Sequence, residues 1–183
     1  MIEDDEKESF SYEIGRSIKE AKLKGVKLSG CTRRNTYKEK TDVILYPDNV
    51  IYHLESSQIS KFVDFVLVNP SSTPNSELKM SSVPWRKLIL ICVHGSRDRR
   101  CGVQGLETFN ELSVLTGSST TSTREVQVYG STHLGGHEFA GTCVVYPESH
   151  WFGYLSKLEA EPFLKAVEKG DIIQELYRGK GLI

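Results

Sequence analysis

The sequence predicts an α/β (α+β) fold with two tandem units, the first of them shortened. A polar segment rich in proline, serine and asparagine divides the 183-residue chain at residues 69–84. Similar passages lie on its two sides, because a Tyr-Pro-Asp motif at residues 46–48 matches a Tyr-Pro-Glu motif at residues 146–148. We therefore predict one unit over residues 1–68, a linker, and a second unit over residues 85–183.

The second unit shows the clearer succession of elements. Residues 87–92, KLILIC, form a short apolar run that predicts a buried strand. Apolar residues at helical spacing predict a helix over residues 103–116. Val126 and Val128 alternate with polar residues and predict the next strand.

The chain then continues with a strand hairpin around the Tyr-Pro-Glu motif and with a last helix. Ser156 and Glu159 have the spacing of a capping box, although Pro162 leaves the start of that helix open. Gly170 is a natural stop for the helix. The resulting order of strand, helix, strand, hairpin and helix is thioredoxin-like.

The first unit repeats only part of this order. Residues 12–24 have helical character, and the Tyr-Pro-Asp motif predicts a strand hairpin followed by a helix. No opening strand comparable to KLILIC is evident before the hairpin. We therefore predict a degenerate thioredoxin-like unit that is shortened at its start.

Composition limits the classes of partner. Hydrophobic residues make up 38% and charged residues 26% of the chain, and the net charge of -1 gives no reason to expect nucleic acid or an anionic membrane surface. No apolar run approaches the roughly 20 residues of a membrane-spanning helix. The acidic start MIEDDEKESF resembles neither a secretory signal nor an arginine-rich transit peptide, which favours a cytoplasmic protein.

Four potential metal ligands are predicted to meet at one edge of the second unit. Cys92 closes the strand KLILIC, and Cys101 follows after a polar loop. His133 and His137 are separated by Leu-Gly-Gly, and the glycines favour a loop over a helix. Because the carboxyl ends of parallel strands meet at one edge of a sheet, we expect the two thiols and the two imidazoles to converge.

Residue spacing alone leaves several interpretations of these side chains open. Two cysteines and two histidines can hold structural zinc, although eight residues between the cysteines exceed the zinc-finger spacing. Cys92 and Cys101 can form a redox-active dithiol, although C-x-x-C is the better spacing. A [2Fe-2S] cluster accepts cysteines on long loops and histidine in place of cysteine. The remaining interpretation is two core cysteines and two surface histidines without a metal.

Three stretches resemble the sucrase/ferredoxin-like family, which belongs to the thioredoxin-like [2Fe-2S] ferredoxins. They are CVHGSRDRRCG, STHLGGHEFAG and VVYPESHWFGYL; the resemblance is strong over residues 87–170 and weak over the first half. The histidine pair resembles the bis-histidinyl branch, which includes the fungal actin-patch-distribution and altered-inheritance-of-mitochondria proteins. The resemblance implies a thioredoxin-like ferredoxin fold with one [2Fe-2S] cluster, held by Cys92, Cys101, His133 and His137.

The resemblance also implies an electron-transfer protein with an unidentified redox partner protein. Because ferric iron acidifies the N–H of a bound imidazole, we expect the redox chemistry to be proton-coupled. It adds mitochondria as a second location beside the cytoplasm. No phosphate-binding glycine loop, flavin signature or carboxylate pair is evident, which favours an electron carrier over an enzyme with a substrate of its own. Arg97, Arg99 and Arg100 either dock an acidic partner or pair locally with Asp98.

Several further residues receive structural interpretations. Trp151 and Phe152 are expected in the core or over the cluster, and Cys143 is expected to be a small buried hydrophobe. His53 lies in the first hairpin and is expected to be structural or solvent-facing. His94 lies inside the polar cysteine loop and is the main rival to the two histidine ligands.

Overall fold

The computed structural model describes residues 10–33, 36, 39–69, 77–96, 98–117 and 125–181. Within them the chain forms two compact units. We call residues 84–181, with the separate segment 29–32, the C-terminal unit. Residues 10–28 and 33–83 form the N-terminal unit.

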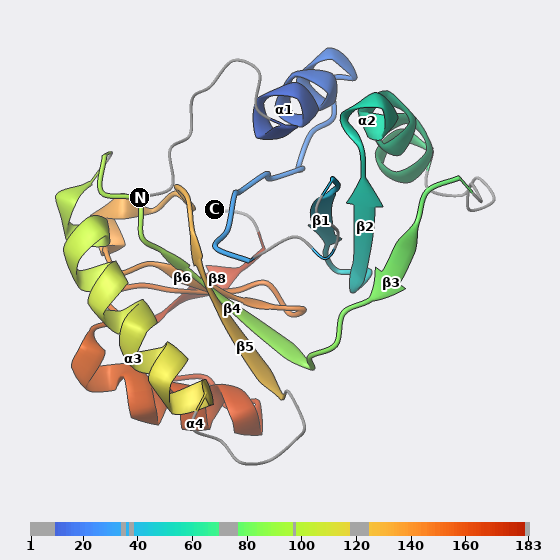
Figure 1. Ribbon diagram of the computed structural model, residues 1–183. Helices are drawn as coiled ribbons and strands as arrows, with labels where there is room; N and C mark the ends of the chain where they lie inside the picture. The colour runs from blue at the N-terminus through green and yellow to red at the C-terminus, as the bar shows by residue number, and fades with distance from the viewer. Residues whose placement is uncertain are drawn as a thin grey trace. The chain divides into compact units, whose positions relative to one another are not determined.

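The C-terminal unit is built on a five-stranded sheet with the strand order β5-β4-β6-β7-β8 (Figure 1). The central strand β4 runs parallel to β5 and antiparallel to β6. The strands are β4 (Lys87–Cys92), β5 (Val126–Ser131), β6 (Cys143–Tyr146), β7 (His150–Phe152) and β8 (Tyr177–Lys180). With α3 (Leu106–Gly117) after β4, β5 before the β6–β7 hairpin and α4 (Ala160–Lys169) after β7, the predicted thioredoxin-like succession of strand, helix, strand, hairpin and helix is confirmed.

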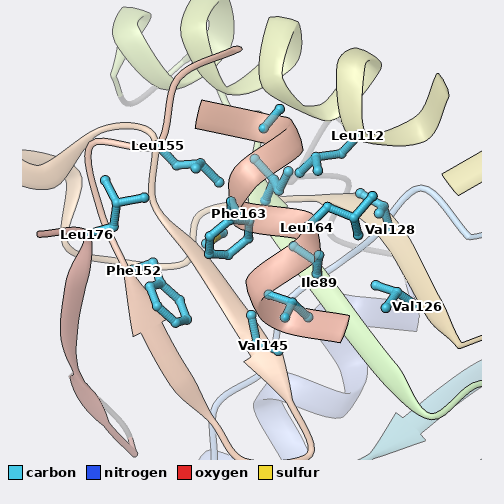
Figure 2. Close-up of a cluster of buried hydrophobic side chains, with 14 residues drawn as sticks. Ile89, Leu112, Val126, Val128, Val145, Phe152, Leu155, Phe163, Leu164 and Leu176 are labelled. Atoms are coloured by element: carbon cyan, nitrogen blue, oxygen red, sulfur yellow. The ribbon is translucent and has the colours of Figure 1, made fainter. Parts of the chain in front are cut away.

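The main core lies between this sheet and the two helices α3 and α4 (Figure 2). Alternate strand residues such as Ile89, Val128 and Val145 point into it, as the period of two along a strand requires. Phe163 of α4 packs edge-on against Phe152 of β7, with ring centroids 5.0 Å apart. Burial of this apolar surface is the main stabilising contribution to the unit.

The last helix ends where the sequence predicts, and the capping box that the sequence suggests precedes its start. Ser156 and Glu159 form the predicted capping box, in which the Ser156 hydroxyl accepts a hydrogen bond from a backbone N–H and the Glu159 carboxylate accepts one from the Ser156 N–H. Gly170 ends the helix in the left-handed conformation, with a φ of 85°. Strand β8 was not expected, because its residues, YRGK, carry no apolar alternation.

Segment 29–32 pairs with the end of β5, which the sequence did not indicate. The Thr32 N–H donates to the Gly130 carbonyl and the Thr132 N–H donates to the Gly30 carbonyl, both at 2.9 Å. Cys31 lies opposite Ser131 in this antiparallel bridge. The pairing holds the end of β5 just before the histidine loop.

The N-terminal unit carries an antiparallel sheet with the order β1-β2-β3 (Figure 1). Its elements are α1 (Phe10–Glu20), β1 (Thr41–Leu45), β2 (Val50–Leu54), α2 (Ile59–Phe62) with a π-helical turn (Val63–Val68), and β3 (Met80–Ser82). As predicted, its described residues contain a hairpin and a following helix but no opening parallel strand. The core formed with α1 and α2 includes Ile14, Leu54 and Phe62.

Strand β3 lies inside the segment that the sequence indicates as a linker, residues 69–84. Its residues, MSS, are exposed and have no apolar face, so only backbone pairing with β2 places them in the sheet. The compact N-terminal unit accordingly extends to Val83.

The two hairpins share their turn geometry. The Tyr46–Pro47 and Tyr146–Pro147 peptide bonds are both cis, and the second residue after each proline, Asn49 or Ser149, has a positive φ.

Among the described residues, the helices are too short or too polar to cross a membrane.

Gly105, just before α3, is where the chain passes close to the end of β4. A Cβ at this position would lie 2.1 Å from the carbonyl oxygen of Cys92, so only glycine allows this approach to the end of β4.

We expect Gly105→Ala to lower the free energy of unfolding by about 1–3 kcal/mol, because either backbone segment must move to admit the methyl group. Gly117→Ala is the matched control, since nothing lies within 4 Å of a Cβ there. Urea denaturation of both variants measures the difference. Equal stability of the two variants would show that the contact at Gly105 imposes no constraint.

Candidate metal centre

Cys92 and Cys101 lie side by side in the C-terminal unit. Cys92 is the last residue of β4, where its N–H donates to the Thr142 carbonyl at 3.0 Å. Cys101 is the first residue of the helical turn Cys101–Gly105 that leads into α3. Both side chains are buried and neither forms a disulfide. The predicted approach of the two thiols is therefore present, and they share a hydrogen bond.

The surroundings favour a thiolate at Cys92. The hydrogen bond from Cys101 is the largest influence and lowers the pKa of Cys92, whereas burial raises it. The backbone N–H groups of Leu134 and His94 and the nearby His133 lower it further, so that the pKa of Cys92 falls to about 5. The same shared proton and burial raise the pKa of Cys101.

The two histidines lie on a glycine loop after β5, as the sequence predicts. Gly135 and Gly136 have φ angles of 95° and 59°, which exclude a helix between the histidines. His137 then begins a short helical turn, His137–Phe139. The His133 and His137 rings face one another at a tilt of 39°, with centroids 6.0 Å apart.

Arg100 connects the cysteine loop to the histidine loop. Its guanidinium donates to both carboxylate oxygens of Asp98 at 3.1 and 2.8 Å, and to the His137 carbonyl at 3.0 Å. Hydrogen bonds from Arg100 lower the pKa of Asp98 to about 2. The local pair with Asp98 is thus present, whereas docking of an acidic partner stays a prediction. Arg97 lies outside the described residues.

An apolar wall lies behind the two cysteines, on the face of the sheet opposite α3 and α4. It comprises Leu134, Ala140, Val144 and Trp151, all buried with Cys92 and Cys101. Trp151 is 1% exposed, so its interpretation as a core residue is confirmed. The wall limits the access of water to the thiols.

Cys143 faces the other side of the sheet and plays no part in this wall. Its side chain is completely buried in the main core, and burial raises its pKa. Its interpretation as a small buried hydrophobe is confirmed.

The four predicted ligands form two pairs, one of thiols and one of imidazoles. Within the described residues, no three His, Cys, Asp or Glu side chains already surround a common point as metal ligands. The donor types nevertheless fit an iron–sulfur cluster, whose two irons can be ligated in pairs by cysteine and by histidine. The ligand assignment therefore stays a prediction, and so does the rival role of His94.

Sequence reasoning missed the backbone donors around Cys92. The N–H groups of Leu134 and His94 direct positive partial charge at its sulfur. Leu134 is almost completely buried, although it stands in a polar loop. An apolar residue between a histidine and two glycines was the one signal that could have indicated a packed loop.

Comparison with known proteins places the chain in a family. The family model described as Sucrase/ferredoxin-like matches residues 1–179. Altered inheritance of mitochondria protein 32 from Meyerozyma guilliermondii is 32% identical over 160 residues, which cover 75% of this chain and 56% of the relative. The protein of that name from Candida glabrata is 25% identical over 176 residues, covering 75% and 55%. The chain therefore spans about half the length of the curated relatives it matches.

Solved structures give a weaker likeness. A thioredoxin-like [2Fe-2S] ferredoxin from Aquifex aeolicus has 15% identity and a TM-score of 0.48, covering 53% of this chain and 94% of that protein. The Cys55Ser variant of that ferredoxin has 14% identity and a TM-score of 0.47, covering 51% and 99%.

For the reduced, metal-free chain we expect one thiolate that persists down to about pH 5. Cys101→Ala removes the proton that Cys101 shares with Cys92, and burial then raises the pKa of Cys92. Ultraviolet thiolate absorption across pH measures the change. Cys143→Ala is the control and leaves the low-pH titration in place. A low-pH thiolate that survives in Cys101→Ala would contradict the proposed hydrogen bond.

Proposed function

The chain belongs to the sucrase/ferredoxin-like family, and on that basis we propose that its C-terminal unit is an electron carrier with one [2Fe-2S] cluster. The residues that would hold the cluster are Cys92, Cys101, His133 and His137. A single observation carries this proposal. Two thiols that form no disulfide lie next to the loop that carries the two imidazoles. When bound, such a cluster accepts and returns one electron.

The pairwise grouping supports iron–sulfur chemistry over structural zinc. A zinc ion needs four donors around one point, whereas a two-iron centre takes two donors on each iron. The close spacing of His133 and His137 suits binding to the same iron. The glycines between them leave the loop free to bring both rings to one metal.

The protein sets the redox potential through charge and hydrogen bonding. Two neutral imidazoles in place of two thiolates remove two negative charges from the ligand set, which raises the potential. The N–H groups of Leu134 and His94 act in the same direction, because they stabilise electron density on the Cys92 sulfur. The apolar wall around Trp151 excludes water from the thiol side.

The imidazoles also supply a route for protons. A histidine that binds metal through one ring nitrogen keeps an N–H on the other, and oxidation of the metal makes that proton more acidic. His137 is exposed, so its proton can exchange directly with solvent. We therefore propose proton-coupled electron transfer, with the proton held on a histidine ring nitrogen.

A thiol-disulfide oxidoreductase is a second candidate, favoured by one specific observation. Cys92 and Cys101 share a proton, and the low pKa of Cys92 supplies the thiolate that dithiol exchange requires. This function uses the metal-free chain. Iron content and colour distinguish it from the electron carrier, and also from a zinc-stabilised interaction module, because only the iron–sulfur form is reddish-brown and bleaches with dithionite.

The redox partner and the compartment remain proposals. Arg99 and Arg100 are exposed beside the histidine loop and offer positive charge to an acidic partner protein. The name of the fungal relatives refers to the inheritance of mitochondria. From that name we propose a mitochondrial location as an alternative to the cytoplasm.

Anaerobically purified protein is expected to contain two irons and two acid-labile sulfides per chain. Cys92→Ala and His133→Ala lose most of this content, because each removes a ligand. His150→Ala, in the β6–β7 hairpin, is the matched control and keeps it. Metal analysis, sulfide analysis and visible absorption measure the outcome. Full occupancy by zinc, or a colourless chain without sulfide, would overturn the proposal.

The midpoint potential is expected to fall with rising pH above the pKa of the oxidised-state histidine N–H, by up to about 59 mV per pH unit for one proton. His137→Cys adds a negative charge, which lowers the potential, and removes one ring proton. Potentiometric titration across pH measures both effects. A potential that does not change with pH would contradict the proton-coupled mechanism.

A further inference from the structure

The sheet of the N-terminal unit holds an acid, a base and a hydroxyl in one hydrogen-bonded chain. The Asp42 carboxylate contacts the Nδ1 of His53 at 2.6 Å. The Nε2 of the same ring contacts the Ser81 hydroxyl at 2.9 Å. The three residues come from β1, β2 and β3 respectively. This is the order of contacts in a Ser-His-Asp nucleophilic site.

Strand register places the three side chains on the same face of the sheet. Asp42 is directly opposite His53 in the β1–β2 pair, and Ser81 is directly opposite Ile51 in the β2–β3 pair. Ile51 and His53 are two residues apart and therefore share a face. Tyr52, which points the other way, packs on Phe62 of α2 with ring centroids 5.1 Å apart. The chain of contacts thus lies on the face opposite the helices.

The charge of Asp42 fixes the tautomer of His53. Burial would raise the pKa of Asp42, but hydrogen bonds from Thr36, His53 and Arg33 lower it. Thr36 alone donates twice, from its N–H at 2.8 Å and its hydroxyl at 2.6 Å. An ionised carboxylate only accepts hydrogen bonds, so the Nδ1 of His53 carries the ring proton. The Nε2 then accepts the hydrogen bond of the Ser81 hydroxyl and can take its proton.

The base is buried, whereas the hydroxyl is exposed to solvent. The side chains of Asp42 and His53 are each 3% exposed, whereas Ser81 is exposed. A substrate can therefore reach the hydroxyl while the pair behind it stays shielded from water. Shielding strengthens the contact between carboxylate and imidazole.

The open edge of β3 supplies backbone donors beside Ser81. The His53 N–H donates to the Lys79 carbonyl and the Val83 N–H donates to the Asn49 carbonyl, so residues 79, 81 and 83 direct their backbone groups at β2. The N–H groups of Met80 and Ser82 consequently point away from β2, at the edge of the sheet. An acyl oxyanion needs a hydrogen-bond donor next to the nucleophile, which is where these N–H groups lie.

We propose that Asp42, His53 and Ser81 form a second, metal-independent site that accepts acyl groups from small carboxylic esters. The Ser81 oxygen bonds to the acyl carbon while its proton passes to the Nε2 of His53. The ester C–O bond then breaks, and the leaving alcohol takes that proton. Water, deprotonated by His53, attacks the acyl-serine, which releases a carboxylic acid and restores Ser81. Asp42 is the positioning residue of the site.

Covalent labelling of the full chain tests this proposal. A fluorophosphonate probe is expected to label Ser81, as located by peptide mass spectrometry. Ser82→Ala is the matched control, because the neighbouring side chain points to the other face; it keeps the label, whereas Ser81→Ala loses it. His53→Gln retains a hydrogen-bonding amide but cannot take a proton, so labelling slows by about a hundred-fold or more. Circular dichroism verifies that each variant folds.

Two further measurements separate chemistry from structure. Hydrolysis of p-nitrophenyl acetate is expected to depend on Ser81 and not on the iron content of the sample. Asp42→Asn removes the charge beside His53 and moves the acidic limb of the labelling-rate profile to lower pH. The proposal is overturned if Ser81 stays unlabelled where a serine hydrolase reacts fully, if another serine takes the label, or if a folded His53→Gln chain reacts at the rate of the natural chain.

Discussion

The parallel pairing of β4 with β5 is the constraint on which the candidate metal centre depends. Cys92 and Ser131 are partners at the carboxyl ends of these strands, so the cysteine loop and the histidine loop leave the sheet at the same edge. Arg100 then joins the loops through the His137 carbonyl, and segment 29–32 holds the end of β5. Without this register, the cysteine loop and the histidine loop, which are far apart in the sequence, would not leave the sheet at one edge.

Both units contain a similar hairpin, but their proposed reactive residues occupy different places in the fold. In the C-terminal unit, the predicted ligands lie at the end of β4 and in the segments that follow β4 and β5, where glycine lets the backbone approach closely. In the N-terminal unit, the reactive chain Asp42, His53 and Ser81 lies across the face of the sheet. A loop can surround an inorganic group, whereas the face of a sheet holds side chains in a row at fixed positions. The proposed functions of the two units follow from this difference.

Local patterns in the sequence predicted most elements of the C-terminal unit. KLILIC became β4 with the predicted bounds, and the capping box at Ser156 and the stop at Gly170 are both present. Strands β3 and β8 and the pairing of Cys31 with Ser131 were missed, because backbone contacts with distant residues create them and no apolar pattern marks them. His53 illustrates the same limit. Its residue type suggested a structural or solvent-facing role, and only strand register reveals Asp42 and Ser81 on either side of it.

The proposed ligation of iron by two ring nitrogens would distinguish this site from an all-cysteine cluster, from zinc and from a plain dithiol. Pulsed electron paramagnetic resonance of the dithionite-reduced protein measures it directly, because imidazole nitrogens bound to a paramagnetic cluster couple to its electron spin. We expect couplings from two histidine nitrogens in the natural chain and from one in His133→Cys. A reduced cluster without nitrogen coupling, or a sample without a paramagnetic cluster, would contradict ligation by His133 and His137.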